Sequence, residues 1–217
     1  MSHSALYVAR SLVGSRFLKH PGFFCVMTTT RNKSSAVSLL KKGKCSAVDR
    51  LENMSIKLGE AAHQVLVTPN AGGDSVVSEC LSVEVLSRLL FSNDTTLIAT
   101  EMDIRYFPSG GSMTDYLIKW GTANVSVSVT RVFDGADLDG ASRILEKKLR
   151  GVAFARKSLF APVQGSECSW ILHIFVPNGK VAKLVKKAWG KLDESVRGGV
   201  VVVVTIWKET ALYDRTR

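Results

Sequence analysis

Five consecutive valines, Val200 to Val204, strongly limit how this chain can fold. In the run from Gly199 to Trp207, apolar side chains do not alternate with polar ones, as they would in a strand with one face in water. A long β-branched run of this kind is typical of a strand that is covered on both faces. The chain is therefore expected to contain a sheet with helices on its two sides.

The segment before this strand predicts a second strand and a helix. Ser169 to Val176 has the character of a buried strand. Lys180 to Leu192 is predicted to be a helix, because its apolar residues recur at the helical period: Val181, Leu184, Val185, Ala188, Trp189 and Leu192. Strand, helix and strand in this order predict a right-handed crossover between parallel strands.

Three helices and three short strands are predicted before this strand–helix–strand unit. Apolar periodicity predicts three helices, over residues 51–66, 75–91 and 137–157. Short segments rich in turn residues separate three strand-like runs, over residues 95–107, 114–120 and 124–133. The predicted fold is therefore α/β with some α+β character: a mixed sheet, in which an antiparallel three-strand meander is followed by a strand–helix–strand unit, flanked by helices.

The net charge of +10 is distributed unevenly along the chain. The first 48 residues hold eight Lys or Arg and no Asp or Glu, whereas residues 49–217 hold 21 basic and 19 acidic side chains. A basic, serine-rich start without acids is typical of a mitochondrial presequence. We expect residues 1–48 to be such a presequence, directing the protein to the matrix, or a disordered basic tail. Residues 49–217 are expected to form one domain, without a membrane span.

Cysteine and histidine spacing does not predict a zinc site. The four cysteines are widely separated and lack Cys-x-x-Cys or Cys/His spacing: Cys25, Cys45, Cys80 and Cys168. His63 and His173 each lie among apolar residues, so we expect packed or surface imidazoles. Phosphate-loop, dinucleotide-binding and GxSxG signatures are also absent from the sequence.

From about residue 75 to 207, the predicted order of helix, three strands, helix and strand resembles the core of the restriction-endonuclease-like (PD-(D/E)XK) superfamily. In that superfamily an Asp begins the second core strand, and a carboxylate, one intervening residue and a Lys lie on the third. Asp115, in Ser112-Met113-Thr114-Asp115-Tyr116, stands at the first of these positions. Ser128 and Thr130 stand where the second acid and the Lys are expected.

The resemblance implies phosphodiester hydrolysis at Asp115 with the help of Mg²⁺ or Mn²⁺. Hydroxyl groups do not supply the charge of a carboxylate, so a second metal ligand would have to come from a neighbouring element. The candidates are Glu101 and Asp103, expected on one face of strand 95–107, and Glu79 on the preceding helix. Arg131 is the candidate for a phosphate contact in place of the missing Lys.

A structural explanation of the same residues stays open. In it Asp115 caps a tight turn, and Glu101, Asp103 and Arg105 form the solvated side of an edge strand.

Two groups of basic residues are candidates for nucleic-acid binding. One group lies in the second half of helix 137–157: Lys147, Lys148, Arg150, Arg156 and Lys157. The other is the set of five lysines on helix 180–192, including Lys183 and Lys187. If both face one cleft, they would follow a phosphate backbone, whereas the simpler explanation is solubility. The aromatic residues are expected in the core rather than in a stacking platform: Phe154, Phe160, Trp170 and Trp189.

The sequence thus predicts a mitochondrial protein that binds or processes nucleic acid, with metal-dependent nuclease activity if the site is active. The alternative is a non-catalytic subunit of a mitochondrial protein or ribonucleoprotein assembly. In that case apolar residues of segment 158–170, such as Leu159, Phe160 and Pro162, would contact a partner.

Overall fold

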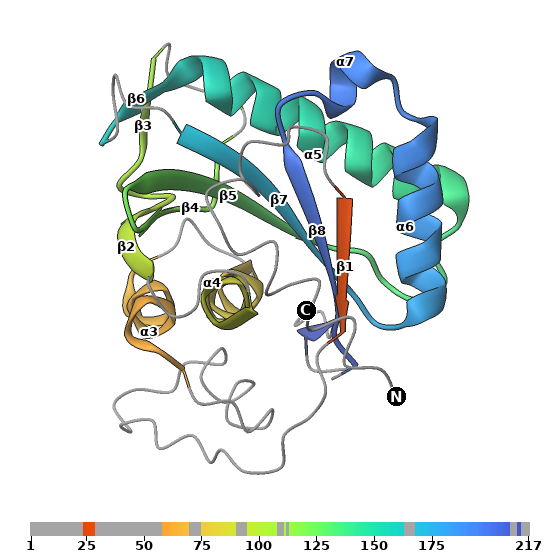
Figure 1. The fold of residues 1–217 in the computed structure, drawn as a ribbon, viewed down its shortest axis with the longest axis horizontal. Coiled ribbons are helices and arrows are strands. Elements are labelled where there is room, and N and C mark those ends of the chain that lie inside the picture. Colours follow the sequence, from red (N-terminus) through yellow and green to blue (C-terminus); the bar gives the residue numbers. More distant parts are fainter. Residues whose placement is uncertain are drawn as a thin grey trace.

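A computed structural model describes residues 24–28, 58–69, 75–89, 95–107, 111, 113–162, 168–208 and 212–213. In these residues six strands form one mixed sheet, and helices lie on both of its faces (Figure 1). The strands from one edge to the other are β1 (Phe24–Thr28), β8 (Val201–Ile206), β7 (Cys168–Val176), β5 (Ala123–Arg131), β4 (Tyr116–Trp120) and β2 (Thr95–Thr100). The α/β fold class predicted from the sequence is confirmed.

The sheet has an antiparallel part and a parallel part. β2, β4 and β5 are antiparallel neighbours, so the predicted meander is present. β5, β7, β8 and β1 run parallel to one another. α6 (Gly179–Lys191) connects β7 with β8, as expected for a strand–helix–strand unit. The turn between β4 and β5 is tight, and Gly121 has a φ of 55° there, which favours glycine.

The valine run of β8 is shared between two hydrophobic clusters. Val201 and Val203 belong to the cluster on the side of α3 (Glu60–Val67) and α4 (Ser75–Leu89). Val202 and Val204 belong to the cluster formed with α5 (Leu138–Ser158) and α6. Because helices cover both faces, every side chain of the run is apolar, which explains the missing alternation. The short α7 (Glu194–Arg197) leads from α6 towards β8.

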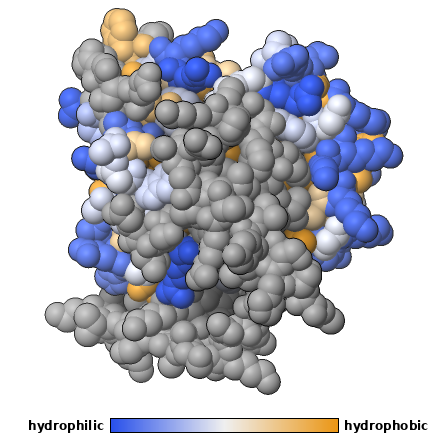
Figure 2. Space-filling view, viewed as in Figure 1, coloured by the Kyte–Doolittle hydropathy of each residue, from blue (hydrophilic) through white to orange (hydrophobic). Residues whose placement is uncertain are grey.

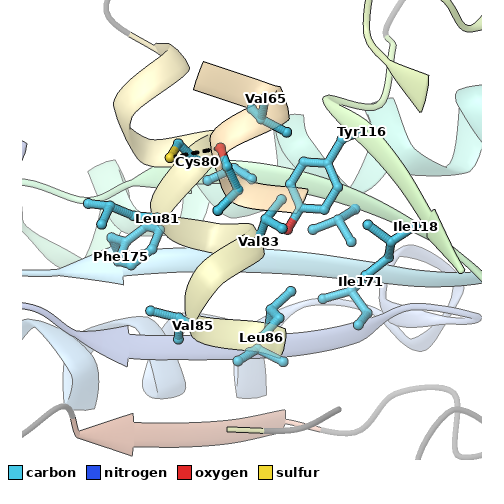
Figure 3. Packing of buried hydrophobic residues seen from close by; sticks show 14 of the residues in the cluster. Val65, Cys80, Leu81, Val83, Val85, Leu86, Tyr116, Ile118, Ile171 and Phe175 are labelled. Carbon is cyan, nitrogen blue, oxygen red and sulfur yellow. Dashed lines mark hydrogen bonds between the residues drawn. The ribbon is translucent and has the colours of Figure 1, made fainter. Parts of the chain in front are cut away.

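α4 closes the first of these clusters. Figure 3 shows Leu81 of α4 beside Phe175 of β7, and Val85 and Leu86 of α4 belong to the same cluster as Ile171 of β7. All five side chains are buried, and each contributes about 1.5–3 kcal/mol relative to an exposed position. The thiol of Cys80 donates a hydrogen bond to the carbonyl oxygen of Ala62, at an S···O distance of 3.2 Å, and so links α4 to α3.

Side-chain caps fix the starts of the two long helices on the other face. The Asp137 carboxylate accepts a hydrogen bond from the Gly140 N–H, 2.7 Å away, and α5 begins at the next residue. The Asn178 side chain accepts one from the Val181 N–H at 3.0 Å, and α6 follows. The helices predicted over 137–157 and 180–192 are confirmed to within one residue.

The single strand predicted over residues 95–107 is wrong. β2 ends at Thr100, and residues 101–103 form a turn. The Asp103 carboxylate closes this turn by accepting hydrogen bonds from the Thr100 N–H (3.1 Å) and hydroxyl (2.9 Å). The chain then forms β3 (Arg105–Tyr106), which pairs with β6 (Leu159–Ala161) in a separate two-stranded sheet.

β1 lies inside the segment 1–48 that the sequence analysis set apart. It pairs in parallel with β8 from Phe24 opposite Val202 to Thr28 opposite Ile206. The sequence analysis predicted no strand there, and the remaining residues of that segment lie outside the described part of the chain. Among the described residues, no helix is both long and apolar enough to cross a bilayer.

Candidate functional site at the start of strand β4

Asp115 lies immediately before β4 and is held against β5. Its own N–H donates to the carbonyl oxygen of Val127 at 3.0 Å. Its carboxylate accepts a short hydrogen bond, 2.6 Å, from the N–H of Val129. Asp115 therefore bonds across to the neighbouring strand rather than capping a tight turn. The carboxylate is fixed beside the middle of the sheet.

The pKa of Asp115 is raised from 3.8 to about 6, mainly because the carboxyl group is buried. The nearby ammonium group of Lys148 and the Val129 N–H lower this pKa, whereas the negative charge of Glu101 raises it. Lys148 and Glu101 thus lie close enough to act on the carboxylate. We call Asp115, Glu101, Lys148 and Tyr106 the Asp115 cluster.

Lys148 reaches this cluster from α5. Ala141, Leu145, Lys148 and Val152 are spaced four, three and four residues apart, which places Lys148 on the inward side of the helix. Its side chain is half-buried. The sequence analysis assigned Lys148 to phosphate binding and missed this position. The signal was present, because a charged residue within an apolar stripe requires a partner or an exit to solvent.

Tyr106 connects β3 to the residue before Asp115. Its hydroxyl oxygen accepts a hydrogen bond from the Thr114 N–H at 2.8 Å. Burial raises the pKa of Tyr106 to about 12, with smaller upward contributions from Asp115, Cys168 and Glu101, while the Thr114 bond lowers it. The phenol is therefore neutral at physiological pH, and Asp115 and Glu101 provide the negative charge of the cluster.

The other predicted residues of the third strand are divided between the two faces of β5. Ser128 is buried, and the register of β4 with β5 places it opposite Asp115. Thr130 is half-buried on the same side of the strand. Arg131 lies on the opposite side, where it donates a 2.8 Å hydrogen bond to the Leu212 carbonyl oxygen. Arg131 thus positions the segment at Leu212 and is directed away from Asp115.

Two of the three candidate second acids lie apart from Asp115. Glu79 is buried on α4, on the other side of the sheet from α5. The carboxylate of Asp103 binds Thr100, so the expectation that Glu101 and Asp103 share a strand face is wrong. In the described ranges no group of three or more His, Cys, Asp or Glu side chains is arranged to hold a metal ion. Asp115 and Glu101 are the carboxylates that the fold brings together.

A second polar group lies under α4 and is fully enclosed. Ser82 of α4 forms hydrogen bonds with the Tyr116 hydroxyl at 2.6 Å and with Nδ1 of His173 at 2.7 Å. Nε2 of His173 is 2.8 Å from the Thr205 hydroxyl. Burial lowers the pKa of His173 to about 3, so the imidazole is neutral. All four side chains are buried, so of the packed or surface imidazole expected at His173 the structure shows the packed one.

The two groups of basic residues lie in one helical layer. α5 and α6 pack against each other on the same face of the sheet. Lys147, Arg150, Lys183 and Lys187 are exposed, and Arg150 forms an ion pair with Glu146 at 2.7 Å. Figure 2 shows a hydrophilic margin on the right, where Figure 1 places α6.

The predicted aromatic core is partly wrong. Trp170 and Trp189 are buried as expected, but 38% of the Phe154 surface is exposed. Phe154 extends outward because its position on α5 is opposite the stripe that faces the sheet. Of the residues suggested for a protein contact, Leu159 is half-buried against both neighbouring clusters, and Pro162 is exposed. The Phe160 side chain lies outside the described part.

Fold and site together define a mixed α/β protein with a buried carboxylate at the start of a central strand. The chain is similar to the "AAC-rich mRNA clone AAC4 protein" of Dictyostelium discoideum, with 29% identity over 199 residues. The alignment covers 83% of this chain and 28% of that protein, so the chain spans less than a third of its relative. No family model and no solved structure matches the chain.

Proposed function

We propose that this chain binds nucleic acid through the outer surface of α5 and α6. The observation that carries the proposal is the charge of these helices. α5 has six basic and two acidic side chains, and α6 has five basic and no acidic ones. Two adjacent helices with this excess attract a polyanion, and neutralising phosphates releases counterions.

The order of the elements supports the same proposal. When β3 and β6 of the separate two-stranded sheet are left out, α4, β2, β4, β5, α5 and β7 come in the order helix, three strands, helix and strand. This is the order on which the likeness to restriction-endonuclease-like proteins rests. Asp115 also stands at the start of the second of these three strands. The position of Asp115 at the start of this strand is thus compatible with a protein that acts on nucleic acid.

The binding proposal is tested by fluorescence anisotropy with labelled DNA and RNA oligonucleotides at several salt concentrations. The variants Lys183→Glu and Lys187→Glu should weaken binding to all sequences, and replacing a phosphate-contacting lysine should reduce the salt slope by about 1. Lys119→Glu is the matched control, because Lys119 is exposed on β4, outside the two helices. Equal affinities for all three variants would contradict a site on α6.

A second candidate function is metal-dependent phosphodiester hydrolysis at the Asp115 cluster. The observation that favours it is that the charges of Lys148, on α5, and Glu101, in the turn after β2, both act on the buried Asp115 carboxylate beside β5. Mg²⁺ is commonly held by one or two carboxylates together with substrate phosphates, so Asp115 and Glu101 are a sufficient minimum. A bound Mg²⁺ would supply an activated water. Lys148 would stabilise negative charge on the phosphate.

Cleavage of labelled oligonucleotides, with Mg²⁺ or Mn²⁺ and with a chelator, tests this second function. Asp115→Asn should abolish metal-dependent cleavage, while its amide oxygen can still accept the Val129 hydrogen bond. Asp139→Asn, an exposed position in the first turn of α5, is the control. If wild type binds nucleic acid but cleaves none of the oligonucleotides, this second function is overturned and the binding proposal stands without it.

We also propose that the protein acts in the mitochondrial matrix, on the basis of the acid-free, basic first 48 residues. Imaging a fusion with a fluorescent protein at the C-terminus tests this. Arg10→Glu combined with Arg16→Glu should redistribute the protein. These substitutions are preferable to deleting the segment, because the deletion would also remove β1.

A further inference from the structure

An exposed aromatic and methionine patch lies where β3 meets the end of α5. Phe107 is 76% exposed and Met113 is 48% exposed, beside the partly exposed Phe154. We call Phe107, Met113 and Phe154 the aromatic patch. Figure 2 shows hydrophobic surface at the upper left, where Figure 1 places β3 and β6. A contiguous exposed apolar patch is informative, whereas single exposed apolar residues are common.

Backbone contacts bring the chain segments that carry these three residues to the end of α5. The Phe107 N–H donates to the carbonyl oxygen of Ser158 at 2.7 Å, one helical turn after Phe154. A Cβ atom added to Gly111 would lie 2.3 Å from the Phe154 ring, so the segment at Gly111 touches this ring. Met113 follows two residues later, and the next residue, Thr114, is bonded to Tyr106. The backbone at Phe107 and the segment at Gly111 therefore both lie against the end of α5.

Basic residues continue the patch along α5. Lys147, Arg150, Phe154 and Lys157 are spaced three, four and three residues apart, so they lie along one side of the helix. All four are exposed. The stripe spans ten residues, which corresponds to about 15 Å of helix. Arg105, also exposed, precedes the patch on β3.

A ligand for this surface needs negative charges and flat apolar groups in regular alternation. Single-stranded nucleic acid has both, since its phosphates suit lysine and arginine and its unpaired bases stack on aromatic rings. A duplex hides the faces of its bases, so aromatic rings cannot stack on them, although its phosphates remain accessible.

We propose that the aromatic patch stacks unpaired bases of a single-stranded nucleic acid, whose phosphates contact Lys147, Arg150 and Lys157. This inference rests on the proposed nucleic-acid binding and specifies its substrate class as single strands. The patch adjoins the Asp115 cluster through Tyr106 and Thr114. A strand bound in this way passes close to Asp115.

The test is fluorescence anisotropy of the full chain with a labelled 12-nucleotide oligothymidine and with a duplex of the same length. Phe107→Ala should weaken binding of the single strand at least about fivefold, the lower end for loss of one stacked base. Duplex affinity should stay unchanged. Phe107→Trp should keep the wild-type affinity and show added fluorescence quenching on binding. Val67→Ala, at a 63% exposed apolar position on α3, is the control.

The possible failures are distinguishable. Absence of binding to any nucleic acid would remove the proposed function and this inference together. Binding that prefers duplex, or that Phe107→Ala leaves unchanged, would overturn the inference alone. Analytical ultracentrifugation tests whether the aromatic patch is instead a dimer interface. A wild-type dimer that Phe107→Ala converts to a monomer would show that a second copy of the chain binds there, and it would overturn the inference. Because Phe107 is exposed, unchanged thermal unfolding of the variant is expected.

Discussion

At the scale of single residues, the enclosed chain from Tyr116 through Ser82 and His173 to Thr205 ties α4 to three strands. Each polar atom is satisfied by another polar atom, so the group contributes to a unique arrangement of helix on sheet. From the sequence, His173 was expected to be a packed or surface imidazole, and its hydrogen-bond partners were not predicted. Hydrogen bonds between residues 82 and 173 depend on tertiary folding, which local patterns do not encode.

The lowered pKa of His173 makes stability depend on acidity. The unfolded state takes up a proton near pH 6.5, but the folded state does so only near pH 3. Between these values the unfolded state binds more protons, so stability falls as pH decreases, by up to about 1.4 kcal/mol per pH unit. Urea denaturation between pH 7 and 4 should show a shallower decline for His173→Gln than for wild type. If the stability of both proteins fell equally with decreasing pH, His173 would not be the source of this pH dependence.

The raised pKa of Asp115 acts in the opposite direction. Between pH 3.8 and about 6 the folded state holds the proton and the unfolded state does not, so this residue costs stability as pH rises. Asp115→Asn should therefore raise the free energy of unfolding at pH 7 by about 1–3 kcal/mol, and the gain should vanish below pH 4. Urea denaturation of wild type and Asp115→Asn at pH 7 and below pH 4 measures this difference in the free energy of unfolding. A lower free energy of unfolding for Asp115→Asn than for wild type at pH 7 would mean that the ionised Asp115 carboxylate stabilises the fold.

At the scale of elements, local patterns predicted α5, α6, β7 and β8 well, because period and capping residues are contiguous in the sequence. They failed over residues 95–107, where Asp103 binds Thr100 and ends β2. β3 then pairs with β6, more than fifty residues further along the chain. The approach of Lys148 to Asp115 likewise depends on how α5 lies on the sheet. The candidate site was therefore predicted at Asp115 and Glu101 but not as a whole.

β8 provides a test of the two-sided core. Val202 is fully buried in the cluster with α5 and α6, so Val202→Ala removes two buried methyl groups and leaves a cavity. We expect a loss of about 2–3 kcal/mol in the free energy of unfolding. Urea denaturation should show a lower midpoint with an unchanged m value. Val67→Ala, at an exposed position, should stay within about 0.5 kcal/mol of wild type.

At the scale of the whole molecule, β1 covers the edge of β8. A chain that begins at residue 29 would leave this edge open to pair with other chains. We expect it to unfold at a lower temperature and to aggregate, whereas a chain that begins at residue 23 should match the full chain. Differential scanning fluorimetry and size-exclusion chromatography compare the two. Identical behaviour would mean that β1 is dispensable for the sheet.

The pairing of β1 with β8 also sets an order of events during synthesis. β1 is translated before every other described strand, and its partner is translated after all of them. The first strand therefore has no edge to join until β8 has been translated. Throughout that time β1 stays accessible to other molecules, and its pairing with β8 then withdraws it from them.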